Sequence, residues 1–380
     1  MPMPDVTPVP LSRMTTLRTG GMPARLIDAA TTDELVTVLR DTWASGDEWL
    51  VLGGGSNLFV GDEPFDGTVV RVRTTGIEWM PSSRPGFVRV RVQAGHSWDD
   101  LCAYAVARGL AGMEAMSGIP GTVGAAPVQN IGAYGQEISQ TLVEVELLDE
   151  STAEVSTVPA SELGLGFRTS VFKQHYGSAP LRPAVILTVT FELAEVGHGE
   201  REVVGAQLRA ALGLRPGEAV SLAWIRDHVL AVRRAKGMVL DDADPDTYSA
   251  GSFFQNAVVS PSFARTLPDE CPRWPLAPDV DPVTIIPLAA YDGVVPAPAS
   301  VESDVKVSAA WLIEHSGLRK GFKLPQSRAA LSTKHALALT NRGGGTAEEL
   351  AELARFIQGR VQSEFGLVLQ PEPVLVGVEL

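Results

Sequence analysis

The glycine-rich stretch at residues 117–135 limits what this chain can fold into more than any other segment. It shows little hydrophobic periodicity, and a loop of that length inside a compact domain is uncommon unless it binds something. Its first half, Gly118–Gly124, reads GIPGTVG, and its second half, Gln129–Gly135, reads QNIGAYG. Glycine lets a ligand approach the backbone closely because it carries no side chain. We predict that the stretch binds a flat or phosphate-bearing ligand, with a purely structural loop as the weaker alternative.

A second glycine cluster, Gly53–Asn57, reads GGGSN and follows the apolar run 49–52, which we predict to be a short strand. Consecutive glycines can turn several backbone N–H groups toward one phosphate. The cluster does not match the Rossmann fingerprint, because Leu58 replaces a required glycine and residues 68–72 indicate a strand where a helix should start. It is not a Walker loop either, since no Gly-Lys-Ser/Thr follows. A tight turn after a strand explains this cluster equally well.

Three shorter motifs carry reactive side chains. Arg168 lies among apolar residues in the segment 166–173, where its partner is either a bound anion or a surface carboxylate. Ser252 lies in Gly251–Asn256, read GSFFQN, which lacks the second glycine of a G-x-S-x-G elbow. It is either a proton donor in a dry pocket or a buried strand residue. Lys236 follows two arginines and either meets a diphosphate or ends a helix as an ordinary cation.

The composition excludes several classes of protein. The chain of 380 residues carries 31 Lys+Arg and 45 Asp+Glu, a net charge of −14, which argues against a nucleic-acid partner. Its two cysteines, Cys102 and Cys271, lie far apart, so we expect no disulfide framework and a reducing, cytoplasmic location. No apolar run is long enough to span a membrane. The six histidines show no ligand spacing, so we expect no metal.

Helix and strand signals are mixed along the chain without a regular strand–helix–strand repeat. Capping boxes that begin at Thr31 and Thr346 predict two helices, and alternating valines predict a strand at 87–92. Residues 241–300 are rich in proline and aspartate, and this change marks a domain boundary. In the tail, residues 367–369 predict a strand that leads into a proline-flanked carboxylate. The mixture favours an α+β fold over a doubly wound sheet.

Taken in order, these clusters resemble the UDP-N-acetylenolpyruvoylglucosamine reductase family, whose members are FAD enzymes of peptidoglycan precursor synthesis. The similarity runs from Thr15-Thr16-Leu17 to Pro371-Glu372 and so covers most of the chain. The uninterrupted segment 127–135 looks like the long-form class of the family. Each cluster alone is a weak signal, whereas five of them in the same order are highly specific.

The resemblance implies an α+β fold with a two-lobed FAD-binding domain of the vanillyl-alcohol-oxidase (PCMH) type and a smaller α+β substrate-binding domain. We expect the first lobe at residues 1–74, completed by a C-terminal strand in 367–380. The second lobe should cover 75–237, and the substrate-binding domain should cover 238–366.

The same resemblance implies non-covalent FAD as cofactor and NADPH as co-substrate. The positions that match the FAD-holding stretches are Gly53, Gly54, Gly55, Ser56, Asn57, Ser117, Gly118, Ile119, Pro120, Gly121, Thr122, Gly124, Ala125 and Ala126. No His or Cys lies in either stretch, which is why we expect the flavin to be non-covalent.

The implied reaction reduces UDP-N-acetylglucosamine enolpyruvate to UDP-N-acetylmuramate. Arg168 and Glu372 would stabilise the enolate, with Glu372 most useful when protonated, and Ser252 would protonate the carbanion carbon. The positions that match substrate contacts are Tyr134, Lys236 and Asn256. We expect a cytoplasmic monomer whose partners are the UDP-sugar and NADPH, with no nucleic acid and no membrane.

The chain departs from the family pattern at three places. Phe167 and Thr169 stand on either side of Arg168, where the family has a tyrosine and often an acid. No tyrosine lies between Val196 and Lys236 to cover the substrate, and no basic residue shortly follows the C-terminal glutamate. Two alternatives remain. Another FAD oxidase on the same scaffold would need no serine–glutamate pair, and a non-catalytic flavin-binding protein would not need to keep the trio.

Overall fold

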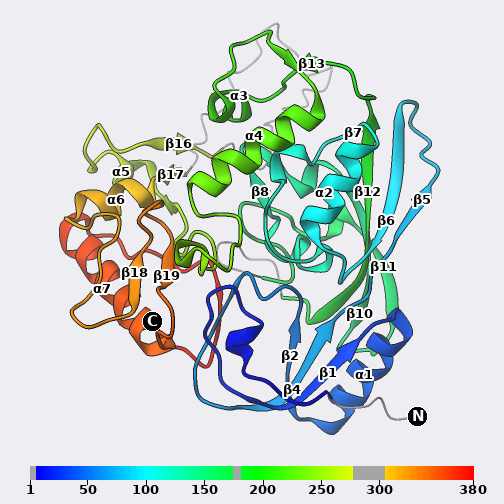
Figure 1. Cartoon of the computed structure of the whole chain (residues 1–380), viewed down its shortest axis with the longest axis horizontal. Helices are drawn as coiled ribbons and strands as arrows, with labels where there is room; N and C mark the ends of the chain where they lie inside the picture. Colours follow the sequence, from blue (N-terminus) through cyan, green and yellow to red (C-terminus); the bar gives the residue numbers. More distant parts are fainter. Residues whose placement is uncertain (1–5, 174–180, 277–303) are drawn as a thin grey trace, which may run out of the picture.

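Three packed regions of mixed helices and strands make up the part of the chain that the computed structural model describes, residues 6–173, 181–276 and 304–380 (Figure 1). This arrangement confirms the α+β prediction. Short 3₁₀ helices connect the elements at Leu11–Arg13, Glu114–Met116, Val123–Ala125, Pro127–Gln129, Ile138–Gln140, Ala160–Glu162 and Pro245–Thr247.

The first region is a parallel three-stranded sheet in the order β1-β4-β2, which α1 covers. Its elements are β1 (Pro23–Ala29), α1 (Thr32–Ser45), β2 (Glu48–Leu52) and β4 (Phe65–Val72). The predicted capping box forms, because the Thr31 side chain accepts from the Glu34 N–H and the Glu34 carboxylate accepts from the Thr31 N–H. Gly46 ends the helix at a left-handed φ of 74°. Leu35 and Leu39 pack the helix onto the sheet.

The second region is an antiparallel sheet in the order β11-β10-β12-β6-β5, with β7 paired to the end of β12. Its strands are β5 (Ile77–Met80), β6 (Phe87–Gln93), β7 (Leu110–Ala111), β10 (Leu142–Asp149), β11 (Val155–Pro159) and β12 (Ala184–Glu195). The helix α2 (Trp98–Ala107) lies on this sheet, where Trp98 and Leu101 share a core with Val90 and Val92. The helix α4 (Leu222–Ala235) packs outside α2 (Figure 1).

The segment between Val196 and α4, which has no tyrosine to cover a substrate, forms a small cap on α4. It contains β13 (Arg201–Glu202), α3 (Ala206–Leu212) and β14 (Ala219–Val220), and the two strands pair antiparallel. Leu208 of α3 and Ile225 of α4 are buried in one cluster. The segment is therefore ordered against the second region through apolar contacts.

In its described residues, the third region holds two small antiparallel sheets, β15-β17-β16 and β18-β19, with three helices. Its elements are β15 (Ala257–Val259), α5 (Pro261–Ala264), β16 (Arg273–Pro275), β17 (Val305–Val307), α6 (Ala309–His315), β18 (Ala329–Leu331), β19 (Leu339–Asn341) and α7 (Ala347–Phe365). The predicted capping box begins α7 at Thr346. Leu17 and Phe59 from the first region join the core of this region, so the two share buried apolar contacts.

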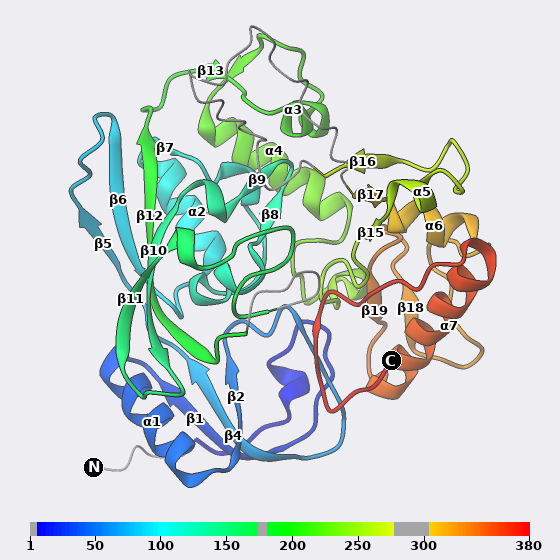
Figure 2. The same cartoon turned by 180° about the vertical axis from the view of Figure 1, so that it is seen from behind.

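The C-terminal strand lies later in the sequence than predicted. Residues 367–369 are not a strand; β20 (Val374–Val376) is, and it pairs in parallel with β3 (Leu58–Val60). The apolar Leu369 is buried in the core beneath α7 and does not join a ladder. Figure 2 shows the red C-terminal segment leaving α7 and passing toward the blue first region. The pairing therefore draws the end of the chain across to the first glycine cluster.

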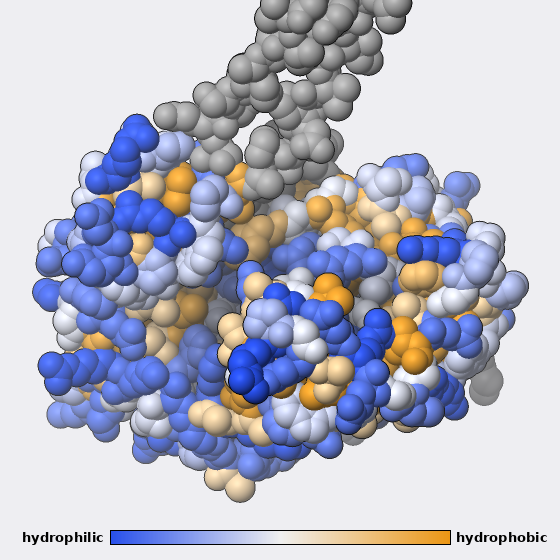
Figure 3. Space-filling view, turned by 90° about the horizontal axis from the view of Figure 1, so that it is seen from above, coloured by the Kyte–Doolittle hydropathy of each residue, from blue (hydrophilic) through white to orange (hydrophobic). Residues whose placement is uncertain are grey.

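The surface seen in Figure 3 offers no continuous apolar patch on the part that coloured atoms cover, since apolar side chains lie scattered among polar ones. Within the described ranges, no helix combines the length and the apolar character that a membrane crossing requires. The short β8 (Gly132–Ala133), near the end of the glycine-rich stretch, pairs with β9 (Gln136–Glu137), which directly follows the stretch.

Candidate active site

Two glycine-rich loops, Gly53–Asn57 and Ser117–Ala126, pack directly against each other. A Cβ atom added at Gly54 would lie 2.6 Å from the Cα atom of Gly121, closer than real Cβ atoms come to backbone. Gly55 also has a left-handed φ of 60°, which disfavours other residues. The loops therefore need glycine for close approach, and they lie far apart in the sequence but together in space.

Several backbone N–H groups of these loops have no acceptor in the described part of the protein. They belong to Gly54–Asn57, Gly121 and Thr122. The Ser56 hydroxyl donates to the Pro120 carbonyl at 2.9 Å and ties one loop to the other. Free N–H groups on two apposed glycine loops suit the phosphates of a dinucleotide. The residues present therefore fit a nucleotide cofactor.

A partly buried ion pair fixes the second loop to its neighbouring helices. Asp99 of α2 accepts the Gly118 N–H at 2.6 Å and receives both terminal nitrogens of Arg226 from α4, at 2.6 and 2.9 Å. Burial acts to raise the pKa of Asp99, but the bonds from Arg226 and Gly118 outweigh it and hold the pKa below its usual value. The Arg233 guanidinium donates to the Met238 carbonyl at 2.9 Å, and its Nε is buried without a partner beside Gly118.

Arg168 reaches the centre of the site from a turn in which its own φ is 54°, an uncommon value for a residue with a side chain. Its terminal nitrogens donate to the carbonyls of Asn130 and Gly132 at 3.3 and 3.1 Å. Its Nε lies 3.1 Å from Oε1 of Glu372, and both side chains are largely buried. The structure thus brings two residues of the predicted trio into direct contact.

The third member of the trio lies beside Glu372 along the backbone. The Glu372 N–H donates to the Phe253 carbonyl at 2.8 Å, and the Gln255 N–H donates to the Gln370 carbonyl at 3.0 Å. These bonds flank an antiparallel bridge, so the segment after Ser252 runs alongside the segment that carries Glu372. Arg168, Ser252 and Glu372 therefore come together from three distant parts of the sequence.

The predicted substrate residues divide into two groups. Lys236 follows the last residue of α4, and its Nζ lies 5.7 Å from the centroid of the Tyr134 ring. Burial raises the pKa of Tyr134, so its hydroxyl is a donor at neutral pH. Asn256 instead uses its Oδ1 to accept the Ala309 N–H at the start of α6, at 3.0 Å. Its side chain thus has a structural bond that the sequence did not indicate, which leaves the amide nitrogen for other contacts.

The region around Lys236 is electrically positive although the chain is strongly acidic overall. Burial, and then the charges of Lys236, Lys320 and Arg233, lower the pKa of His335 from 6.5 to about 4. The His335 Nδ1 accepts the Leu337 N–H at 3.0 Å, a role that requires the neutral ring. The lowered pKa of His335 therefore indicates a cluster of cations around it, and an anionic ligand would balance their charge.

Other residues of the site were not among the predicted catalytic, cofactor-binding or substrate-binding residues. Gln129 and Lys173 contact the Glu372 segment directly. Lys306 of β17 lies 4.5 Å from the centroid of the Phe167 ring, next to Arg168. The available signal for Lys173 was its place at the end of the Arg168 motif. No local signal marks Lys306, because β17 reaches Phe167 only through the fold.

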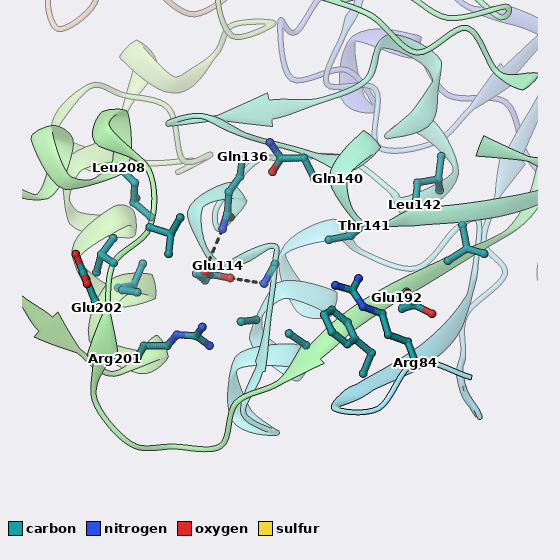
Figure 4. A pocket seen from close by; sticks show the side chains of 18 residues that line it. Arg84, Glu114, Gln136, Gln140, Thr141, Leu142, Glu192, Arg201, Glu202 and Leu208 are labelled. Atoms are coloured by element: carbon teal, nitrogen blue, oxygen red, sulfur yellow. Dashed lines mark hydrogen bonds between the residues drawn. The ribbon is translucent and has the colours of Figure 1, made fainter. Parts of the chain in front are cut away.

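A cavity of about 340 Å³ lies elsewhere, between the end of β12 and the cap on α4. Figure 4 shows Arg84, Glu114 and Arg201 around it, with Glu114 bonded to Gln136. None of the predicted site residues lines this cavity. The glycine loops and the trio thus mark the candidate site.

Two family models match parts of this chain, and named proteins are similar to it along nearly its whole length. Residues 23–158 match a family model described as an FAD binding domain, and residues 244–376 match one described as the C-terminal domain of UDP-N-acetylenolpyruvoylglucosamine reductase. The chain is similar to the proteins of that name from Leifsonia xyli subsp. xyli, at 52% identity over 98% of this chain and 99% of the relative, and Thermobifida fusca, at 46% over 98% of each. A solved reductase structure from Thermus caldophilus shares the fold, at a TM-score of 0.60, 24% identity and coverage of 98% and 99%.

His335 should make the fold sensitive to acid. Its folded pKa of about 4 lies below the unfolded value of 6.5, so the unfolded chain binds more protons between these values and stability falls as the pH drops through that window. We expect the parent to lose about 2 kcal/mol more than His335→Asn between pH 7 and pH 5. Urea unfolding at both pH values measures the difference, and equal losses would contradict a neutral, buried His335.

Proposed function

The chain belongs to the UDP-N-acetylenolpyruvoylglucosamine reductase family, and from this premise we propose that it reduces UDP-N-acetylglucosamine enolpyruvate to UDP-N-acetylmuramate with FAD and NADPH. The contact between Arg168 and Glu372, with the Ser252 segment bonded alongside, is the observation that carries the proposal. One cation, one carboxylic acid and one hydroxyl beside a dinucleotide cradle supply the groups that such a reduction requires.

The two apposed glycine loops support the assignment of FAD. Gly53–Asn57 and Ser117–Ala126 would hold it through backbone N–H groups, without a covalent bond. When bound, FAD carries hydride from NADPH to the methylene carbon of the enolpyruvyl ether. The Asp99–Arg226 pair keeps the second loop in place by binding the Gly118 N–H.

Arg168 stabilises the negative charge that develops on the substrate carboxylate and the adjacent carbon. A well-placed donor in a site that excludes water contributes about 3–4 kcal/mol to such a transition state. The carbonyls of Asn130 and Gly132 fix the direction of its guanidinium before substrate arrives. Glu372 forms an ion pair with Arg168. Its carboxyl can donate a hydrogen bond only when it is protonated, that is, after contacts with the substrate have replaced this ion pair.

Ser252 supplies the proton to the carbanion carbon. A serine hydroxyl is a weak acid, and it suffices here because a carbanion is a very strong base. The neighbouring Phe253 and Phe254 are fully buried and offer no substitute proton donor. Lys236 and Tyr134 bind the diphosphate and the sugar, and the cation cluster that lowers the pKa of His335 supports this assignment.

The monomeric state and the cytoplasmic location stay predictions. Light scattering on the purified protein tests the first, and cell fractionation tests the second.

Gly54 should be essential for flavin binding. In Gly54→Val the new side chain would meet the backbone of Gly121 and force the loops apart, so we expect the purified variant to lack the yellow flavin absorbance of the parent. Gly359→Ala in α7 is the matched control, because a Cβ there meets nothing within 4 Å, and it should retain flavin fully. Full retention in Gly54→Val would rule out this loop as the cofactor site.

Lys236 should act in binding more than in chemistry. Lys236→Ala removes a cation that contacts the substrate equally in ground state and transition state, so KM for the UDP-sugar should rise about tenfold while kcat changes less than threefold. Steady-state kinetics with saturating NADPH measures both constants. Arg265→Ala, directly after α5 in the third region, is the control and should leave KM unchanged. An unchanged KM in Lys236→Ala would mean that Lys236 is only a cation at the end of a helix.

Ser252 should separate the two half-reactions. Flavin reduction by NADPH involves no substrate carbanion, so Ser252→Ala should reduce its flavin at nearly the parent rate. Reoxidation by the enolpyruvyl substrate needs the proton, and loss of a general acid slows it about 10²–10⁴-fold. Ser252→Cys should recover part of that rate, since a thiol is a stronger acid of similar shape. Anaerobic stopped-flow measures both steps, and equal slowing of the two would mean that Ser252 is structural.

A further inference from the structure

Lys173 is a buried cation at the point where three distant segments meet. Its side chain is only 7% exposed. Its Nζ donates to the backbone carbonyl of Glu372 and, at 2.9 Å, to Oε1 of Gln129. The backbone of Lys173 is itself fixed, because its N–H and carbonyl both bond to Ser170. The ammonium is therefore held rigidly against the segment that carries Glu372.

No ion pair within the described ranges involves Lys173, so its ammonium is buried among neutral acceptors. Burying a charge without a paired carboxylate is costly, and such groups persist where they have a role. The pKa of Lys173 is lowered from 10.5 to about 8: burial is the largest cause, the charge of Glu372 opposes it, and the charge of Arg168 adds a smaller lowering effect. The group thus changes charge just above neutral pH, beside two members of the trio.

Gln129 extends the contact to the first glycine loop. Its Oε1 accepts from Lys173 and from Nδ2 of Asn57, at 2.7 Å, which fixes the orientation of the amide. Its Nε2 then points to Oε1 of Glu372 at 3.5 Å. The Val374 N–H donates to the Asn57 carbonyl at 2.9 Å, so Glu372 lies between two tethers.

We propose that Lys173 is a positioning residue, whose ammonium holds the main chain of Glu372 so that the carboxyl meets Arg168. The proposal rests on the proposed role of Glu372 in the substrate half-reaction. Loss of the ammonium removes one tether while the β20–β3 pairing keeps the strand in place. The Glu372 carboxyl then shifts relative to Arg168, and a displacement near 1 Å at a reacting group slows chemistry by ~10²-fold.

The charged groups that face Lys173 determine the direction of its pH effect. Arg168 and Glu372 are the ones that act on it, from the Arg168 motif and the C-terminal segment. As the pH rises through about 8, the ammonium loses its proton and its bond to the Glu372 carbonyl weakens. Substrate reduction in the parent should therefore decline above pH 8, whereas flavin reduction by NADPH should show no decline with that midpoint.

Lys173→Met and Lys173→Arg, with Lys323→Met as an exposed lysine control, test the proposal in the flavin-loaded enzyme. We expect Lys173→Met to retain flavin, to reduce it with NADPH at the parent rate, and to reoxidise it with substrate ~10²-fold more slowly. Its decline above pH 8 should be absent. Lys173→Arg keeps the charge and should recover most of the rate, and Lys323→Met should match the parent throughout.

A double variant distinguishes positioning from a general structural effect. If Lys173 acts through Glu372, adding Lys173→Met to Glu372→Gln should slow the substrate step less than threefold further. Independent, additive slowing by the two substitutions would overturn the proposal. A parent enzyme whose substrate step does not decline above pH 8 would also overturn it, and this measurement does not depend on the folding of any variant. If Glu372→Gln itself leaves the substrate step unchanged, the proposed function of Glu372 fails instead.

Discussion

The contact between two glycine backbones, Gly54 and Gly121, is the constraint on which the rest of the site depends. It lets the loop after β2 lie against the loop that follows α2 and β7, although β4, β5 and β6 separate them in sequence. Each loop also has a contact that holds it in place. The pairing of β20 with β3 holds the end of the first loop, and the Asp99–Arg226 pair holds the second loop. A side chain in the contact would part the loops and disturb both supports, so the cradle is set by the backbone more than by its polar side chains.

The return of the C-terminus makes the catalytic geometry a property of the whole fold. After α7 the chain crosses from the third region to the first, and on the way Glu372 bonds to the segment after Ser252 and pairs with Arg168. These contacts join residues from all three regions. Small relative movements of the regions would change the distances at the site directly, which is why buried tethers at that point matter more than the same bonds would elsewhere.

Local signals in the sequence predicted what is local in the structure. The capping boxes at Thr31 and Thr346 begin helices where expected, because each motif satisfies N–H groups within its own turn. The trio was identified through a family resemblance, and only the fold brings its members together. The position of β20 and the bond from Asn256 to α6 could not be predicted, since each depends on a partner far away in the sequence. Lys173 is an intermediate case. The sequence indicated the motif that contains it, whereas its contacts with Gln129 and Glu372 depend on the fold.

Burial and net charge together explain how an acidic chain builds a site for anions. Lys173, Arg233 and Lys306 lie around the candidate site, and burial is the largest influence that lowers the pKa of each. Neighbouring carboxylates do not neutralise these three cations fully, so positive charge remains in a place where water is scarce. Electrostatic interactions strengthen as water is excluded, so an incoming carboxylate or diphosphate gains more there than on the surface. Glu372, Asp99 and Glu137 act on Lys173, Arg233 and Lys306 respectively, and each opposes the effect of burial only in part. An anionic ligand would relieve the free-energy cost of holding these cations together, whereas a neutral ligand would not, and the site is therefore selective for anions.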